Sequence, residues 1–313
     1  MRAIRLVANR NIVLSLAILV GFLVGPGVRS LELVTLPALM IVMTLSTTQI
    51  PSRVFLESGK FVGATVIALA ASYGGAGLVF IILSRPLMVS PELWAGFVLV
   101  GIIPPAIAVI PFVDILGGDT RLALLGVFGS YIVSLALVPV LSVFLLKGFF
   151  VHPIRVLMTL FLLVVVPLAL SRMLMRIHLT QYIGRWRAPI TNWCFFVVTV
   201  TAIGLNRDLM LREPLTLLRV FVVAAAGTFG VGTLLQYVLV RLEVKPHLRR
   251  ALLLLATLKN GGLAIAIALS SFGENASYPA AIVIICSILY FLWLGRAGAE
   301  DRHQDSARRV PTS

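Results

Sequence analysis

Lys259 and Asn260 are the residues of this chain best placed to do chemistry. With Gly261 and Gly262 they stand in the middle of the apolar run "ALLLLATLKNGGLAIAIALSS". At about 1.5 Å per residue, Lys259 lies roughly 18 Å from either end of the span expected at residues 247–272, too far for its side chain to reach water. A lysine at this depth must face a polar cavity, pair with another group or lose its proton. The twelve acidic residues fall at run ends, in loops or in the tail, so we expect an anionic substrate to be its counter-ion.

A second apolar run is also interrupted near its middle. The stretch "ELWAGFVLVGIIPPAIAVIPFVDILGGD" contains Pro104 and Pro105. Proline lacks an amide hydrogen and clashes with the preceding turn, so a double proline breaks or sharply kinks a helix. Backbone amide and carbonyl groups that lose their helical hydrogen bonds in this way are tolerated within a membrane only where they are buried in protein or line a water-filled cavity.

The composition indicates an integral membrane protein. Hydrophobic residues make up 59% of the 313 residues and charged residues 12%, against roughly 25% charged residues in a soluble domain. The net charge of +14 comes from basic residues that punctuate apolar runs, so it does not indicate a nucleic-acid partner. Cys194 and Cys286 fall inside apolar runs without other metal-ligand residues, so we expect no metal site and no cofactor.

Ten apolar runs are each close to the roughly 20 residues that span a bilayer. The expected spans are residues 11–27, 31–50, 61–84, 92–117, 121–147, 154–176, 189–209, 214–240, 247–272 and 278–296. With the N-terminus in the cytoplasm, most Lys and Arg residues fall in cytoplasmic loops, as the positive-inside rule requires. Both termini are therefore expected in the cytoplasm, in a multi-pass protein of the cell or inner membrane.

The interrupted runs are the fourth and the ninth of the ten. A division after the fifth span gives two five-helix repeats, residues 1–150 and 151–297, followed by a disordered cytoplasmic tail at 298–313. Because five is odd, the second repeat enters the membrane inverted relative to the first. Matched broken helices in inverted repeats are typical of secondary transporters with a binding site near the membrane midplane.

Two motifs give the chain a resemblance to the bile acid:sodium symporter family. The stretch "GIIPPAIAVIPFVDILGGD", running into "TRLALLGVFGSYIVSLALVP", resembles the family's proline-containing crossover helix and the span that follows it. The stretch "LKNGGLAIAIALSSFGENASYPAA" resembles the family's Gln-Asn-x-Gly-Leu-Ala motif, which Asn260 and Gly262 match. The resemblance implies ten helices in a panel domain and a core domain, with the broken helices crossing in the core.

Departures from the family pattern fall on its sodium ligands. Leu255 stands where the family has a glutamate, and Lys259 stands in place of a glutamine. The family's Ser-Asn pair aligns with Val109 and Ile110, whereas Ser130 keeps one hydroxyl ligand. A site that has lost oxygen ligands and gained a positive charge is unsuited to sodium, so the departures predict sodium-independent transport.

We therefore expect an all-α polytopic membrane protein that carries small organic anions by alternating access and is not an enzyme. Its partners would be the anion, membrane lipid, and protons or another coupling ion. Lys259 would bind the anion, and Asn260 would hydrogen-bond the substrate or the opposing break. The small Gly261 and Gly262 would allow close crossing with Pro104 and Pro105. Ser130 and Thr257 are further candidates, whose hydroxyls could instead bond back to their own helices.

Four other functions stay open at this point. They are a sodium-coupled organic anion symporter with degenerate sites, an auxin-efflux-like carrier, a cation/proton antiporter and a passive anion channel. The antiporter would require a midmembrane aspartate in the first half, where none is found. A membrane enzyme would require acidic metal-binding clusters, and the loops hold only scattered single acids.

Overall fold

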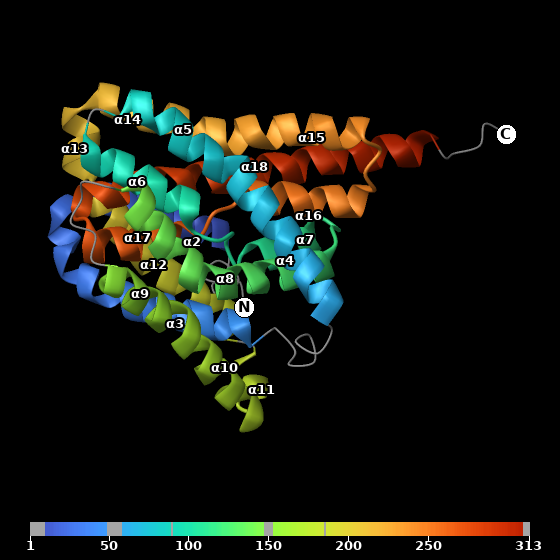
Figure 1. The fold of residues 1–313 in the computed structure, drawn as a ribbon, viewed down its shortest axis with the longest axis horizontal. Helices are drawn as coiled ribbons and strands as arrows, with labels where there is room; N and C mark the ends of the chain where they lie inside the picture. The colour runs from blue at the N-terminus through green and yellow to red at the C-terminus, as the bar shows by residue number, and fades with distance from the viewer. Residues whose placement is uncertain (1–9, 49–57, 89, 147–152, 185, 309–313) are drawn as a thin grey trace.

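Helices account for nearly all of the described structure (Figure 1). The computed structural model describes residues 10–48, 58–88, 90–146, 153–184 and 186–308. Within these residues, seven helices are long and apolar enough to cross a membrane, the first being Ile12–Thr47 and the last Glu274–Gly295. Large apolar side chains such as Leu23, Leu33 and Phe144 are exposed on the outside. These features confirm the expected polytopic α-helical membrane protein.

The helical elements follow one another with short connections. They are α2 (Arg10–Val24), the 3₁₀ turn η1 (Gly25–Leu31), α3 (Glu32–Thr47), α4 (Ser58–Ser72), the π-helical η3 (Tyr73–Gly77), α5 (Leu78–Leu87), α6 (Pro91–Ile102), α7 (Val109–Ile115), α8 (Thr120–Leu145), α9 (Pro153–Leu160), the π-helical η4 (Phe161–Val165), α10 (Val166–Arg176), α11 (Thr180–Ile183), α12 (Arg187–Leu205), α13 (Arg207–Arg212), α14 (Pro214–Ala225), the π-helical η5 (Ala226–Gly230), α15 (Val231–Arg241), α16 (Pro246–Thr257), α17 (Gly261–Ser271) and α18 (Glu274–Arg308).

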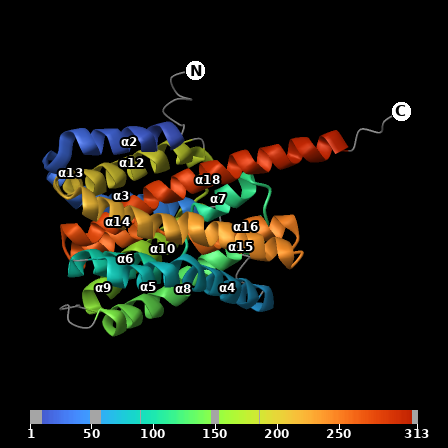
Figure 2. The same ribbon diagram turned by 90° about the horizontal axis from the view of Figure 1, so that it is seen from above.

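Two groups of helices pack side by side. The group that we call the panel consists of α2, η1, α3, α10 and α12, in which α12 packs on α2, η1 and α3, and α10 packs on α3. Figure 2 shows α2, α12 and α3 along one side of the molecule, with α4, α5 and α8 on the opposite side. The group that we call the core contains α4–α8 and α14–α18, joined by contacts such as α4 with α8 and α6 with α18. The site described below lies where the two groups meet.

Small residues hold two core helices close together. A Cβ atom added to Gly126 of α8 would lie 2.7 Å from the Cβ of Ala68 on α4, and one added to Gly129 would lie 1.8 Å from the Thr65 hydroxyl oxygen. In membranes, where lipid is as apolar as a leucine, such close backbone contact is a main source of helix association. This packing holds α4, which leads directly into η3, against α8.

Both predicted helix breaks are found in the core. α6 ends at Ile102 and α7 begins at Val109, while α16 ends at Thr257 and α17 begins at Gly261. The first break contains the double proline, and the second contains the lysine and asparagine. The helices on either side of the breaks are too short to cross a bilayer alone, because a span requires about 20 residues.

The structure adds two features to the sequence interpretation. α2 and α3 are joined through η1 in one continuous helical run, so the turn between the first two predicted spans is itself helical. α18 is helical to Arg308 and so includes part of the stretch from residue 298 that was expected to be a disordered tail. Residues 309–313, and residues 49–57 at the boundary between the expected spans 31–50 and 61–84, lie outside the described residues.

Candidate functional site

The two helix breaks cross each other and satisfy each other's backbone groups. The amide of Ala106 donates to the carbonyl oxygen of Leu258 at 2.9 Å, and the amide of Asn260 donates to that of Pro104 at 3.2 Å. Between these bonds, Pro105 pairs with residue 259 as an isolated antiparallel bridge. Backbone groups that lipid could not satisfy are thus paired inside the protein, as membrane burial demands.

Lys259 carries its positive charge into the centre of this crossing. Its ammonium nitrogen donates to the hydroxyl oxygen of Ser72 at 2.9 Å, to the carbonyl oxygen of Gly101 at 2.9 Å and to that of Ile103 at 3.0 Å. The residue is 3% exposed. An ammonium has three donors, so these three neutral oxygens use all of them. The structure thus gives the deep lysine three partners, all of them neutral protein oxygens.

Two of those oxygens belong to the end of a helix. Gly101 lies in the last turn of α6 and Ile103 is its C-cap. The final carbonyl groups of a helix lack intrahelical partners and carry the negative end of the helix dipole, where a cation is favourable. The Lys259 ammonium group therefore compensates the partial negative charge at the C-terminal end of α6, which stops at the double proline.

The remaining contacts of Lys259 come from the π-helical segment in the third apolar run. Ser72 ends α4 and Tyr73 begins η3, and the ammonium nitrogen lies 4.6 Å from the centre of the Tyr73 ring. A Cβ atom on Gly77 of η3 would lie 2.6 Å from the Gly101 oxygen and 3.3 Å from the Lys259 nitrogen. Glycine at this position thus lets η3 approach α6, and π-helical segments are frequent at functional sites.

Asn260 caps α17 and joins the crossing to α8. Its side-chain oxygen accepts a hydrogen bond from the amide of Leu263 at 3.1 Å, and its amide nitrogen donates to the hydroxyl group of Tyr131. An asparagine at a helix N-cap satisfies one of the first free amides of the helix. Both polar atoms of the Asn260 side chain are therefore engaged, because the oxygen caps α17 and the nitrogen holds the start of α17 against Tyr131.

The two glycines after Asn260 allow close approaches other than the expected one. A Cβ atom on Gly261 would lie 2.3 Å from Ile284 of α18, and one on Gly262 would lie 2.8 Å from Leu39 of α3. Neither nearest neighbour is a proline of the opposing break. Gly261 thus packs the crossing against a core helix and Gly262 packs it against the panel, while Pro104 and Pro105 are buried at the crossing itself.

Ser130 and Thr257 are buried and bonded within their own helices. The Ser130 hydroxyl donates to the Gly126 carbonyl at 2.7 Å, and the Thr257 hydroxyl donates to the Leu253 carbonyl at 2.7 Å. Neither residue lines the cavity described next. Their geometry matches the alternative of hydroxyls that bond back to the preceding turn.

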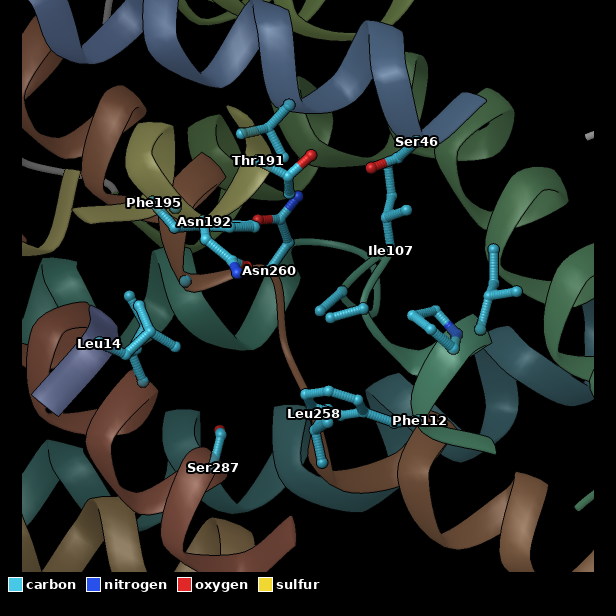
Figure 3. A pocket seen from close by; sticks show the side chains of 18 of the residues that line it. Leu14, Ser46, Ile107, Phe112, Thr191, Asn192, Phe195, Leu258, Asn260 and Ser287 are labelled. Atoms are coloured by element: carbon cyan, nitrogen blue, oxygen red, sulfur yellow. The ribbon is translucent and has the colours of Figure 1, made fainter. Parts of the chain in front are cut away.

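A cavity of about 430 Å³ lies between the panel and the core beside the crossing. Lys259, Asn260, Gly261 and Gly262 contribute to its wall, together with many apolar side chains from α3, α7, α12 and α18. In Figure 3, one side of the cavity holds Ser46, Ile107, Thr191, Asn192, Phe195 and Asn260, and the other side holds Leu14, Phe112, Leu258 and Ser287. The volume and the mostly apolar wall are those of a small-molecule site.

The panel and the core are joined by polar contacts beyond one end of the cavity. The side chains of α12 and its C-cap from Val198 to Asn206 are buried, whereas its beginning near Arg187 is only partly covered. The Asn206 amide donates to the Ser277 hydroxyl of α18 at 2.9 Å, and Arg29 of η1 pairs with Glu274 of α18 at 2.6 Å. These contacts hold the groups together at the C-terminal end of α12.

The sequence did not point to Ser72, Tyr73 or Tyr131 as members of the site. Each lies on a different apolar run from Lys259, and hydroxyl groups are common in such runs. One signal was available, because the glycine-rich stretch "SYGGAG" interrupts the third run just where η3 forms.

Comparison with known protein families supports the resemblance that the double-proline motif indicates. Residues 36–213 match the sequence model of the Sodium Bile acid symporter family, which covers more than half of the chain. The match contains the double-proline break and ends before the break that holds Lys259. No curated protein sequence matches the chain.

Proposed function

The chain belongs to the sodium bile acid symporter family, whose members are multi-pass membrane transporters and not enzymes, and from this we infer that it carries small organic anions by alternating access without sodium. The observation that carries the proposal is the ammonium nitrogen of Lys259, held by three oxygens beside a cavity of about 430 Å³. Membrane lipid surrounds such a protein, and protons or another ion would replace sodium as the coupling ion.

Lys259 makes the crossing unsuitable for a sodium ion. Sodium prefers oxygen ligands, and the ammonium nitrogen already uses the oxygens of Ser72, Gly101 and Ile103. Two unit charges 4 Å apart repel by about 4 kcal/mol at an effective dielectric constant of about 20. Such a penalty lowers ion affinity about a thousandfold. Leu255, where the family has a glutamate, is fully buried and provides no compensating charge.

This arrangement changes the role that we assign to Lys259. Its donors are used by the protein, so we propose that it acts as a fixed cation whose field favours an anion in the cavity, in place of a direct bond to the substrate. Asn260 would act through the position of α17, whose N-terminus carries the positive end of the helix dipole toward the crossing.

Ten membrane spans in two inverted repeats provide the proposed framework. Ile12–Thr47 would supply two spans with their turn at η1, and each broken pair, α6–α7 and α16–α17, would supply one more. The π-helical segments η3 and η5 support the repeats, because each interrupts the helix that precedes a broken pair. The proposed repeats are residues 1–150 and 151–297, followed by the C-terminal tail, with both termini in the cytoplasm.

Alternating access would move the core against the panel. The ion pair of Arg29 with Glu274 and the hydrogen bond of Asn206 with Ser277 would close the cavity at one end, and would have to break when that end opens. By the predicted orientation this end lies outside the cell, so the cavity would be accessible from the cytoplasmic end of α12.

Transport in proteoliposomes tests the proposal. A set of radiolabelled organic anions is offered with sodium or with choline as the only external cation, and uptake is measured over time. We expect saturable uptake of at least one anion that is equal in the two salts. Uptake that disappears without a sodium gradient would contradict sodium independence, and flux that never saturates and cannot be driven uphill would indicate a channel.

A further inference from the structure

Arg187 is a cation of the cavity wall with an unused hydrogen-bond donor. It is the first residue of α12, is partly buried, and lines the cavity. Its Nε atom is buried and has no hydrogen-bond partner among the described residues. A buried donor without a partner costs about 1–3 kcal/mol, so such groups in native structures usually serve a purpose.

The other cation of the wall does not share this property. Lys259 has its three donors bonded to protein oxygens. The residues that line the cavity include these two cations and no aspartate or glutamate. An anion in the cavity would therefore meet two positive charges and no negative one. Of the two cations, Arg187 is the one with a buried donor left for it, and the Ser287 hydroxyl of the wall is likewise buried without a partner among the described residues.

The residues that follow Arg187 on α12 divide the wall by polarity. Thr191 and Phe195, four and eight residues further along, line the cavity on the same helical face, as does Asn192. Ser46 of α3 lies on the same side as Thr191 and Asn192. Across the cavity lie Leu14 and Leu258, with the Ser287 hydroxyl as the polar group labelled there (Figure 3). A ligand that fits both sides has a polar, charged end and an apolar body.

We propose that Arg187 determines the specificity of this transporter by binding the carboxylate or sulfonate group of an amphipathic organic anion, whose apolar body lies against the remaining wall. The proposal rests on the proposed function for its substrate class. A guanidinium group matches a carboxylate in geometry and can form two parallel hydrogen bonds with it. Occupation by the anion would give the Nε donor of Arg187 its missing partner.

The test compares two probes that differ only in charge. Binding of 4-biphenylcarboxylate and of the neutral 4-biphenylmethanol is measured by calorimetry on the full chain in lipid nanodiscs. We expect Arg187→Gln to weaken carboxylate binding about tenfold or more and to leave alcohol binding within about twofold, because a hydrogen bond to a charged group is lost. Arg187→Lys, which keeps the charge without the planar fork, should lie between Arg187→Gln and the wild type.

Arg176→Gln serves as the matched control, since Arg176 is exposed at the end of α10 and does not line the cavity. Equal losses for both probes in Arg187→Gln would overturn the proposal, as would a wild type that binds the carboxylate no more tightly than the alcohol. Arg187-dependent binding without sodium-free uptake would leave the inference standing and refute the proposed transport.

Discussion

The ammonium nitrogen of Lys259 lies 2.9 Å from the carbonyl oxygen of Gly101, 158 positions away along the chain. The carbonyl belongs to the last turn of a helix that ends at a double proline, and the lysine belongs to the other helix break. The second break therefore supplies a cation to the free carbonyl groups of the first break, and the first break supplies carbonyl oxygens to the buried lysine of the second. The following predictions depend on this pairing or on the contacts around it.

Replacement of Lys259 with glutamine should destabilise the protein. The shorter side chain cannot reach the oxygens of Gly101 and Ile103 together, and a buried acceptor left unpaired costs about 1–3 kcal/mol. Relief of the buried charge offsets part of this loss, so we expect a net loss of about 1–3 kcal/mol, measured as a lower Tm in detergent. The same substitution at Lys245, an exposed lysine, should leave Tm unchanged. An unaltered Tm in Lys259→Gln would refute the structural role of the ammonium group.

Restoration of the family residues should create a sodium response. In the double variant Leu255→Glu with Lys259→Gln, a carboxylate replaces a fully buried leucine and the positive charge is removed. Sodium at about 100 times its Kd would then stabilise the folded state by about 2.7 kcal/mol. Thermal unfolding in sodium and in choline chloride measures the difference. Leu255→Glu alone should show no sodium response, because the carboxylate would pair with Lys259, and a response in the wild type would contradict the prediction.

Ser72 and Ser130 should differ in their importance. The Ser72 hydroxyl accepts a hydrogen bond from the Lys259 ammonium group, while the Ser130 hydroxyl is bonded to its own helix. Hydrogen bonds to charged groups contribute about 1.5–3 kcal/mol and ordinary ones about 0.5–1.5 kcal/mol. Ser72→Ala should therefore lower Tm more than Ser130→Ala and should also reduce uptake. Equal effects of the two substitutions would show that the ammonium group does not depend on Ser72.

The two bonds of Asn260 can be separated by conservative substitution. Asn260→Asp keeps the oxygen that caps α17 and loses the donor to Tyr131, whereas Asn260→Ala loses both. Loss of an N-cap typically costs about 1 kcal/mol. We therefore expect Asn260→Ala to lower the free energy of unfolding more than Asn260→Asp, measured by chemical denaturation in mild detergent. A reversed order would mean that the buried carboxylate costs more than the cap contributes.

Loss of the Arg29–Glu274 ion pair should favour opening at that end of the cavity. Both side chains are partly exposed, and such pairs contribute up to about 1 kcal/mol, which shifts a two-state equilibrium up to about fivefold. A cysteine at position 287 of the cavity wall, in a background without Cys194 and Cys286, reports opening through its labelling rate with an impermeant maleimide. Arg29→Ala should speed labelling.

Arg212→Ala is the control for this measurement, because its ion pair with Asp208 lies within α13 and joins no two helix groups. Labelling that is equally fast in the wild type, Arg29→Ala and Arg212→Ala would contradict a closing role for the Arg29–Glu274 pair. Restored slow labelling in the exchanged pair Arg29→Glu with Glu274→Arg would support it.

The sequence by itself determined the membrane class, both helix breaks and the depth of Lys259. Hydropathy and helix breaking are local properties, because each apolar run must cover its own backbone in lipid and each proline acts on its own turn. The family motifs are local as well, and they indicated the family that the sequence-model match confirms. A charge that could not reach water was therefore visible at Lys259 before any neighbour was known.

Only the tertiary structure decided which groups surround that charge. Ser72 lies 187 positions from Lys259, and its contact depends on the register and rotation of α4 against the crossing, which glycines of α8 set through close packing. Packing also turned the glycines of the second break toward α3 and α18, and brought Arg187 to the cavity wall. These contacts join apolar runs whose local sequences are alike. Which residues meet is therefore decided by how whole helices pack against one another.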